Sequence, residues 1–341
     1  MTRVSVIVPC RNERDYLDAF LESVFAQTPA SPDQALEVVI ADGMSDDGTR
    51  EHLEDWQRRQ PDLVVIDNPE RITSTALNRA IERATGDIIV RMDVHTVYAS
   101  DYIAECVRVL DRTGATCVGG PWRPAGDEGL QGAIARAFES RFGSGGAASR
   151  RSQYSGPVDT VYLGAWRRAD LIRLGGFDEF LVRNQDDELN LRILRSGGMV
   201  WQSASIRSSY APRASLQGLF RQFYQYGYWK IPVIRKHRLP ASPRHLVPFA
   251  FVLTLALLAA TAPLWPPAGV AGLALLAIYF VAALASATGS SRLLVNPRET
   301  LTIAMAFACM HFGYGIGFGH GLLDFVVLGK GPHDAMTRLT R

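Results

Sequence analysis

Residues 86–95 read Gly-Asp-Ile-Ile-Val-Arg-Met-Asp-Val-His, a short apolar run that stops at an acidic side chain. Comparable apolar runs stand at Val4–Val8, Leu36–Ala41 and Leu63–Ile66. Between them lie segments whose apolar residues recur with helical spacing, as in Glu13–Ala26. This order, with strands that are apolar on both faces, is typical of a parallel sheet covered by helices. The sequence therefore predicts an α/β fold with a mostly parallel sheet.

Polar residues gather where the predicted strands end. Pro9–Glu13, Asp42–Gly48 and Asp93–His95 each follow an apolar run directly. Two further helices are expected, from about Thr49 to Gln60 and over Ser74–Ala84. Because ligands of open parallel sheets bind beyond the carboxyl ends of the strands, these polar segments predict a binding site at one edge of the sheet.

The composition limits the possible partners. With a net charge of +2 over 341 residues and no long basic run before residue 235, the chain does not favour nucleic acid. The cysteines show no metal-ligand spacing, which favours a reduced domain that faces the cytosol. They are Cys10, Cys106, Cys117 and Cys309. Hydrophobicity is uneven, because the first ~240 residues read as a soluble protein and most of the last ~95 are apolar.

The apolar C-terminal part is expected to lie in a membrane. An amphipathic, aromatic-rich stretch that stops near Pro232 suits the membrane–water interface. Residues 246–264 and 269–287 each approach the ~20 residues needed to cross a bilayer. Residues 301–328 form either one tilted span or a re-entrant hairpin. Basic residues before the first span place the N-terminal domain inside. The expected parts are a globular domain (1–213), an interfacial segment (214–244), a transmembrane region (245–330) and a tail (331–341).

Residues 141–157 have the composition of a loop, rich in Gly, Ser and Arg. Loops of this length without secondary structure are often functional. We therefore expect a mobile flap over the site.

Several motifs now occur in a fixed order. They are Val-Ser-Val-Ile-Val-Pro-Cys-Arg-Asn-Glu at 4–13, Val-Ile-Ala-Asp-Gly at 39–43 with Ser-Asp-Asp-Gly-Thr at 45–49, Leu-Asn-Arg-Ala at 77–80, Gly-Asp at 86–87 leading to Asp93, and Gly-Gly-Phe-Asp at 175–178 followed by Gln-Asp-Asp-Glu-Leu at 185–189. Together they resemble the inverting family-2 glycosyltransferases of the GT-A (Rossmann-like) fold, over about residues 3–240. The Asp-Val-His form and the apolar tail resemble succinoglycan-type exopolysaccharide glycosyltransferases with C-terminal membrane segments.

The resemblance implies a metal and diphosphate site. A divalent cation, Mn²⁺ or Mg²⁺, would neutralise the departing diphosphate, held by one or two carboxylates and by the phosphates themselves. Asp93 is the expected ligand. The family usually has Asp-x-Asp, and His95 stands at the third position, where imidazole suits Mn²⁺ better than Mg²⁺. The alternatives are a strand-end cap for Asp93 and a surface loop residue for His95.

The resemblance also implies a nucleotide pocket. Asp42 would contact the uracil or the ribose. Asp46 and Asp47 either assist it or cap the following helix. Pro9, Arg11 and Glu13 would line the same pocket. Asn78 and Arg71 would face the nucleotide or its phosphates, and a solvated helix face explains Arg71 equally well.

Asp186 aligns with the aspartate of the family's Glu-Asp motif, and Gln185 replaces the glutamate. As general base it would accept the proton of the acceptor hydroxyl, a contribution of ~10²–10⁴-fold. A place in the first turn of a helix favours the ionised carboxylate. The alternative is a charge that only complements the helix dipole. Glu188 either supports the base or pairs with Arg192 at i,i+4.

Residues 222–230 occupy the place of the Gln-x-x-Arg-Trp motif of processive members. The arginine is absent at the matching spacing, which argues against a processive synthase. Trp229 either stacks on an acceptor sugar or anchors its helix to lipid. His311, His320 and Asp324 fall at membrane depth, where they either contact a lipid diphosphate or stabilise helix packing.

These features predict an inverting hexosyltransferase of the inner membrane, multi-pass, with its catalytic domain in the cytoplasm. The resemblance implies that it moves a hexose from a nucleotide sugar to a polyprenyl-diphosphate-linked glycan in exopolysaccharide synthesis. Among nucleotide sugars, the resemblance favours UDP-glucose as the donor. One alternative is a polyprenyl-phosphate sugar synthase, and another is a non-catalytic subunit that binds nucleotide sugar. A Rossmann dehydrogenase is rejected, because the turn after the first strand lacks Gly-x-Gly-x-x-Gly.

Overall fold

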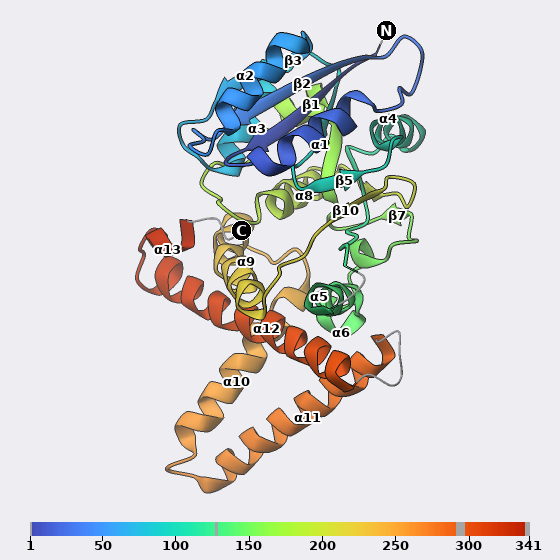
Figure 1. Ribbon diagram of the computed structural model, residues 1–341. Helices are drawn as coiled ribbons and strands as arrows, with labels where there is room; N and C mark the ends of the chain where they lie inside the picture. The colour runs from blue at the N-terminus through green and yellow to red at the C-terminus, as the bar shows by residue number, and fades with distance from the viewer. Residues whose placement is uncertain (1, 127–128, 291–296, 338–341) are drawn as a thin grey trace. The chain divides into compact units, whose positions relative to one another are not determined.

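The computed structural model describes residues 2–126, 129–290 and 297–337 (Figure 1). This part of the chain forms two compact units. The α/β unit contains the residues up to Arg123 and Arg151–Tyr210, and the helical unit contains Pro124–Arg150 and the residues from Ala211 onward. The unit boundary at residue 210 lies close to the one expected at 213. Residues 124–150, however, group with the helical unit, which the sequence did not indicate.

The α/β unit is built on an eight-stranded sheet with the order β3-β2-β1-β4-β8-β6-β9-β7. Neighbours β3, β2, β1 and β4 are all parallel, as are β6 and β9, while β8 runs antiparallel to β4 and β6. The mostly parallel sheet confirms the α/β fold predicted from the apolar runs. The strands are β1 (Arg3–Cys10), β2 (Ala35–Asp42), β3 (Leu63–Asp67), β4 (Ile88–Arg91), β6 (Cys117–Gly120), β7 (Gly156–Pro157), β8 (Tyr162–Arg167) and β9 (Val200–Gln202); β5 (Thr96–Tyr98) and β10 (Ser208–Tyr210) form a small second sheet.

Helices of the α/β unit follow the strands in the expected order. The first, α1, buries Leu17, Phe20, Leu21 and Val24, which is the i, i+3, i+4, i+7 stripe of an amphipathic helix. That stripe joins the core formed by the buried side chains of β1. The helices are α1 (Arg14–Phe25), α2 (Thr49–Arg59), α3 (Thr73–Arg83), α4 (Tyr102–Thr113), α7 (Arg168–Arg173) and α8 (Gln185–Arg195).

Strand register brings the predicted site residues to one edge. Cys10 at the end of β1 pairs with Asp42 at the end of β2, and Asp42 pairs in turn with Asp67 at the end of β3. Because these strands are parallel, the loops that follow them emerge side by side. The fold thus places the polar segments after β1 and β2 next to each other, as the sheet-edge rule predicted.

The helical unit contains two long, largely exposed helices and a third that is half-buried. Figure 1 shows α10 and α11 as a hairpin, with α12 packed on α9. Its elements are α5 (Gly129–Glu139), α6 (Arg141–Ser144), η1 (Ala148–Arg150), α9 (Leu216–His237), η2 (Pro243–His245), α10 (Val247–Thr261), α11 (Pro266–Ser290), α12 (Pro297–Leu322), η3 (Leu323–Val327) and α13 (Asp334–Thr337).

Glycines set the distance between α9 and α12. Gly313, Gly317 and Gly321 recur every four residues on α12, and each lies against a backbone carbonyl of α9. A Cβ atom at Gly317 would stand 2.0 Å from the carbonyl oxygen of Tyr224, so no larger residue fits without moving a helix. Small residues with this spacing are the common device for close helix packing in membranes.

Within the described part of the chain, three helices are long and apolar enough to cross a membrane: Pro243–Thr261, Pro266–Ser290 and Pro297–Val327. They lie close to the three apolar runs expected from the sequence. Residues 297–322 form one continuous α-helix, so the hairpin alternative for the third run is not what the structure contains.

Two local expectations were wrong. Residues 141–157 are not one continuous loop, because they contain α6 and η1, and β7 pairs with β9. Helix α9 does not stop at Pro232 but continues to His237. Proline removes the N–H partner of the Tyr228 carbonyl. That oxygen lies against Gly321 of α12, and the neighbouring Ile231 and Val233 are buried, so tertiary packing holds the helix through the proline.

Candidate active site

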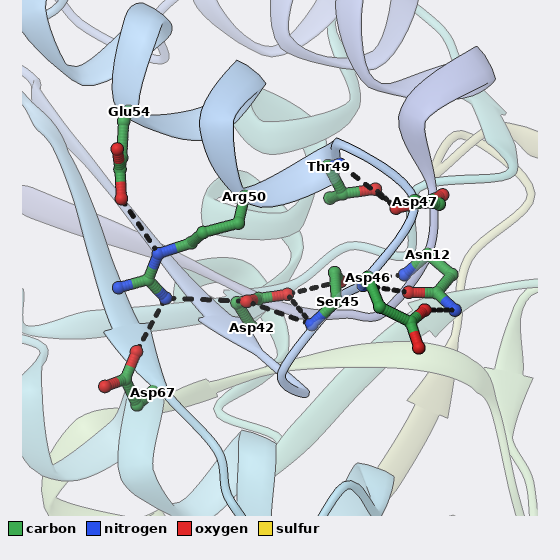
Figure 2. A network of polar contacts seen from close by, with 9 residues as sticks. All are labelled: Asn12, Asp42, Ser45, Asp46, Asp47, Thr49, Arg50, Glu54 and Asp67. Carbon is green, nitrogen blue, oxygen red and sulfur yellow. Dashed lines mark hydrogen bonds and ion pairs between the residues drawn. The ribbon is translucent and has the colours of Figure 1, made fainter.

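Asp42 anchors a polar network at the carboxyl end of β2. Its side chain is buried, with 1% exposure. The carboxylate accepts a hydrogen bond from the Ser45 hydroxyl at 2.5 Å and lies 3.4 Å from Nη1 of Arg50 (Figure 2). A buried carboxylate needs such partners, because an isolated charge in the protein interior is strongly unfavourable. The sequence identified Asp42 but not the residues that hold it.

Arg50, in the first turn of α2, connects the ends of two strands. Its Nη1 also donates to Asp67 Oδ1 at 2.6 Å, and its Nε donates to Glu54 at 3.3 Å. Burial alone would lower the pKa of Arg50, but the carboxylates of Asp67 and Glu54 outweigh it and raise the pKa above its ordinary value. The guanidinium is therefore a fixed positive charge beside Asp42. In the sequence, the only indication of a role for Arg50 was its position one residue after Thr49, at the start of a predicted helix that follows one of the site loops.

Asp46 and Asp47 use their carboxylates to tie loops together (Figure 2). Asn12 Nδ2 donates to Asp46 Oδ1 at 2.8 Å, and the Asp46 N–H donates back to Asn12 Oδ1 at 3.0 Å. Asp47 accepts from the backbone N–H and the hydroxyl of Thr49 at 3.0 and 2.6 Å. Asp47 thus has the capping contact that was the alternative to a role in binding, whereas the contacts of Asp46 join the loops that follow β1 and β2.

Arg91 brings Asp93 and Asp186 together. It is the last residue of β4, its side chain is 5% exposed, and its Nε and Nη2 donate to the two oxygens of Asp93 at 2.9 and 3.0 Å. The remaining Nη1 donates to Asp186 Oδ1 at 2.5 Å. Asp186 stands at the second position of α8, 95 residues further along the chain. The planar guanidinium, with donors in a fixed fork, suits this bridging of two carboxylates. The sequence did not identify Arg91.

Asp186 and Arg91 both have pKa values that are shifted by their surroundings. Burial raises the pKa of Asp186 to about 6; the nearby charge of Asp93 adds to this effect, and Arg91 opposes it. Even so, 34% of the Asp186 side chain is exposed, so an acceptor hydroxyl has access to the carboxylate. Burial alone would lower the pKa of Arg91, but the carboxylates of Asp186 and Asp93 hold it above its ordinary value. Asp186 is thus a carboxylate that both accepts and releases a proton near neutral pH.

His95 pairs with Glu13 across the loops that follow β1 and β4. Its Nδ1 lies 2.9 Å from Glu13 Oε2, and its ring makes an edge contact with Tyr16. The His95 side chain is 51% exposed, and that of Asp93 is 27% exposed. One carboxylate and one imidazole are a donor set that fits Mn²⁺ when phosphate oxygens complete the coordination. The chemistry of these two side chains therefore fits a divalent cation.

The other predicted site residues lie in more structural surroundings. Glu188 is fully buried and pairs with Arg192, its i,i+4 partner, at 2.5 Å. Asn78 donates to the Phe177 carbonyl at 2.9 Å and accepts from the Phe177 N–H at 2.8 Å, which holds the 177–179 loop. Gln185 is buried at the start of α8. These contacts support the structural alternative for Glu188 and give Asn78 a loop-holding role.

Two more donor-pocket residues lie beside the network of Asp42. Pro9 is in β1, opposite Ala41, and the side chain of Arg11 passes over Gly43. A Cβ atom on Gly43 would lie 3.1 Å from Cβ of Arg11, so this glycine permits the close approach. Arg71 has a left-handed backbone with φ 60° and an exposed side chain.

Trp229 is buried within the helical unit. It is in α9 of the helical unit, with 0% exposure, and its Nε1 donates to the Met336 carbonyl at 3.0 Å. Its ring contacts Tyr228 and Phe325. With no exposed ring face, it cannot stack on a sugar in this structure, so the acceptor role expected for Trp229 is corrected to a packing role.

Comparison with known proteins places this geometry in context. The model of the family described as "Glycosyl transferase family 2" matches residues 5–175. The chain is 32% identical to the succinoglycan biosynthesis protein ExoA of Rhizobium meliloti, over 94% of this chain and 95% of that protein. It is 27% identical to the dolichyl N-acetyl-alpha-D-glucosaminyl phosphate 3-beta-D-2,3-diacetamido-2,3-dideoxy-beta-D-glucuronosyltransferase of Methanococcus voltae, over 94% of this chain and 96% of that protein.

A solved structure agrees with these relatives. The mannosyltransferase PcManGT of Pyrobaculum calidifontis, in complex with GDP-Man and Mn²⁺, superposes with a TM-score of 0.61 at 26% identity, covering 92% of this chain and 87% of that one. The likeness extends over both units, and it confirms the GT-A fold that the ordered motifs indicated.

Proposed function

This chain belongs to glycosyl transferase family 2, and from that premise we propose that it transfers a hexose from a nucleotide sugar to a lipid-linked glycan with inversion at the anomeric carbon. It is a glycosyltransferase of glycan biosynthesis. UDP-glucose is the donor we propose, and a polyprenyl-diphosphate-linked oligosaccharide in exopolysaccharide assembly is the acceptor. The observation that carries the proposal is the bridge that Arg91 makes between Asp93 and Asp186.

The Arg91 bridge fixes Asp186, the proposed general base, relative to Asp93, the proposed ligand of the cation that binds the diphosphate. The acceptor hydroxyl oxygen attacks the anomeric carbon of the donor while Asp186 takes the hydroxyl proton. The bond between the anomeric carbon and the phosphate oxygen breaks, and the diphosphate leaves with the bonding electrons. One displacement with one base inverts the configuration. A pKa of about 6 leaves Asp186 mostly ionised at neutral pH and still basic enough to accept the proton.

The loops after β1, β2 and β4 would hold the donor. Asp42, buried and fixed by Ser45 and Arg50, would accept hydrogen bonds from the base or the ribose. Asp93 and His95 would bind a divalent cation together with the diphosphate, and that cation would neutralise the charge of the leaving group. The solved relative in complex with Mn²⁺ and GDP-Man supports the use of a divalent cation. Arg91 holds Asp93 in position from the protein side.

The helical unit would anchor the enzyme in the membrane. The three candidate spans among the described residues support a membrane protein, which we propose to be a multi-pass protein of the inner membrane with its catalytic domain in the cytoplasm. Both relatives that match along their whole length support glycan assembly, and the name of the second specifies an acceptor sugar carried on dolichyl phosphate. This similarity favours a lipid-linked glycan over the bare polyprenyl phosphate used by polyprenyl-phosphate sugar synthases.

The test is sugar transfer into lipid by membranes that contain the full chain. Labelled UDP-glucose, UDP-galactose, UDP-N-acetylglucosamine and GDP-mannose are each supplied with Mn²⁺ or Mg²⁺ and with oligosaccharide-loaded lipid carrier. We expect transfer from one donor, lost in Asp186→Asn and retained in Asp187→Asn, which removes the adjacent carboxylate of the same helical turn. Transfer that survives Asp186→Asn would overturn the assignment of the base, and nucleotide binding without transfer from any donor would favour the non-catalytic subunit.

A further inference from the structure

Two histidines and an aspartate converge at the end of α12 in the helical unit. The Nε2 atom of His320 lies 3.3 Å from Asp324 Oδ2, and the Nε2 atom of His333 lies 3.4 Å from the same oxygen. All three ligand atoms lie within 4.8 Å of one another. The chain after α12 must turn back to bring His333 to the helix, so this grouping is not visible in the sequence spacing.

The separations between these ligand atoms are compatible with a metal site. An N–H···O hydrogen bond has a donor–acceptor distance of about 2.7–3.2 Å. Ligand atoms bound tetrahedrally to Zn²⁺ at about 2.0–2.2 Å stand about 3.3–3.6 Å apart by simple geometry. The two measured separations, 3.3 and 3.4 Å, fall in the second range. The third separation, between ligand atoms of the two histidines, is at most 4.8 Å, and the 55% exposure of the His333 side chain leaves room for a rotation that would shorten it.

Tyrosines of α9 orient two of the three ligands. The hydroxyl of Tyr224 lies 2.7 Å from Nδ1 of His320, which leaves Nε2 of that ring directed toward Asp324. The hydroxyl of Tyr228 donates to Asp324 Oδ2 at 2.8 Å. Metal-binding histidines almost always use their second ring nitrogen for such a hydrogen bond, and metal-binding carboxylates are hydrogen-bonded as well. The partners of a metal site are therefore already present.

Burial gives a reason for a cation here. The Asp324 side chain is 3% exposed, and its ion pairs in the described part of the chain are to the two histidines. A carboxylate removed from water requires a positive charge or a metal ion. Histidines satisfy that need only when they are protonated, whereas a divalent cation satisfies it with both rings neutral.

We propose that His320, Asp324 and His333 bind Zn²⁺ and thereby fasten the segment after α12 to the end of that helix. Two imidazoles and one carboxylate suit zinc and not Mg²⁺, which prefers oxygen ligands. Water fills the fourth position, on the side of the exposed His333. The three residues of this site are not those proposed to bind the cation that accompanies the nucleotide sugar, Asp93 and His95. The same segment is held by Trp229, which donates to the Met336 carbonyl.

The test measures the metal content of the full chain in detergent, without a histidine tag. The protein is stripped with a chelator, exchanged against zinc, desalted and analysed by elemental mass spectrometry. We expect about one zinc per wild-type chain, since the residues form one site. Asp324→Asn, which keeps the size of the side chain, and His333→Ala, at an exposed position, should each lose it. His52→Ala, which removes a histidine from the α/β unit, should retain it.

A second measurement reports whether zinc fastens the segment after α12 to that helix. Zinc should slow trypsin cleavage after Lys330 in the wild type, Mg²⁺ should not, and Asp324→Asn should lose the protection. Circular dichroism establishes that each variant is folded. Zinc content at background in the folded wild type would overturn the proposal, as would full zinc content in both Asp324→Asn and His333→Ala. These outcomes are independent of sugar transfer, so they leave the proposed glycosyltransferase activity to its own test.

Discussion

Arg91 and Asp186 are joined by a hydrogen bond of 2.5 Å between Nη1 and Oδ1, although they lie on β4 and α8 and are separated by 95 residues. The other two guanidinium nitrogens, Nε and Nη2, donate hydrogen bonds to Asp93. A single buried cation thereby fixes the relative positions of the proposed base and the proposed metal ligand. The arrangement makes Arg91 a positioning residue for both.

Replacing Arg91 with lysine should impair catalysis while retaining the positive charge. A lysine ammonium cannot reproduce the planar fork that binds both carboxylates. The resulting misplacement of the base should lower kcat by about 10²-fold. Steady-state kinetics with saturating donor and acceptor measure the effect. Arg167→Lys, which replaces a half-exposed arginine paired with Asp111, is the control. An unchanged kcat in Arg91→Lys would contradict the positioning role.

The rate should fall on the acid side of about pH 6. Asp186 acts as a base only when ionised, and burial raises its pKa to about 6, so protonation below that value removes the active form. The pH dependence of kcat/KM, followed from about pH 5 to pH 8, reports this titration in the free enzyme. The His95→Asp enzyme is the control and should keep the same acid limb. Loss of the acid limb in that variant would contradict its assignment to Asp186.

Removing Arg50 should weaken donor binding more than turnover. Arg50→Gln deletes the charge that holds Asp42 and Asp67, and a hydrogen bond to a charged group contributes about 1.5 kcal/mol. This corresponds to an increase of about tenfold in the KM of the nucleotide sugar. Arg58→Gln, on the same helix but paired with Asp55 at the surface, should leave the KM unchanged. Equal effects of the two variants would rule out a specific role for Arg50.

An aspartate at position 95, as in the family's usual Asp-x-Asp, should change the metal preference. His95→Asp replaces an imidazole with an oxygen ligand, which favours Mg²⁺ over the cations that tolerate nitrogen. The ratio of activity with Mg²⁺ to activity with Mn²⁺ should therefore rise. Chelation should abolish transfer by both enzymes, and the added cation should restore it. If the ratio does not change, His95 is not in contact with the ion.

Gly317 should not tolerate a larger residue. A leucine at this position would place Cβ 2.0 Å from the Tyr224 carbonyl oxygen and would force α12 away from α9. Overpacking of this kind costs about 1–3 kcal/mol or more. Thermal unfolding of the detergent-solubilised chain should detect it. Gly289→Leu is the control, because a Cβ there meets nothing within 4 Å. Equal stability of the two variants would show that the helices adjust freely.

The residue types and their order were sufficient to predict the fold and the family. The apolar runs at 4–8, 36–41 and 63–66 became β1, β2 and β3, because strands buried on both faces require continuous apolar sequence. The ordered motifs indicated a family-2 glycosyltransferase, and the family comparison confirmed it. The roles assigned to Asp42, Asp93, His95 and Asp186 stay predictions until the variants are measured.

Local patterns failed where distant packing determined the outcome. Pro232 indicated a helix end, but α9 continues through it because α12 packs against the interrupted turn. Trp229 looked suitable for a sugar, but it is buried against Tyr228 and Phe325. Burial depends on what packs against a residue, and neither helix period nor residue type contains that information.

The sequence by itself determined the alternation of strands and helices, the chemistry present at the strand ends and the three apolar segments, since each depends on neighbours in the chain. Only the tertiary structure decided which of these groups meet. It joined Arg91 to Asp186, Arg50 to Asp42, and His333 to Asp324. Such contacts between residues of different elements depend on strand register and helix packing, and these in turn depend on the burial of the whole core.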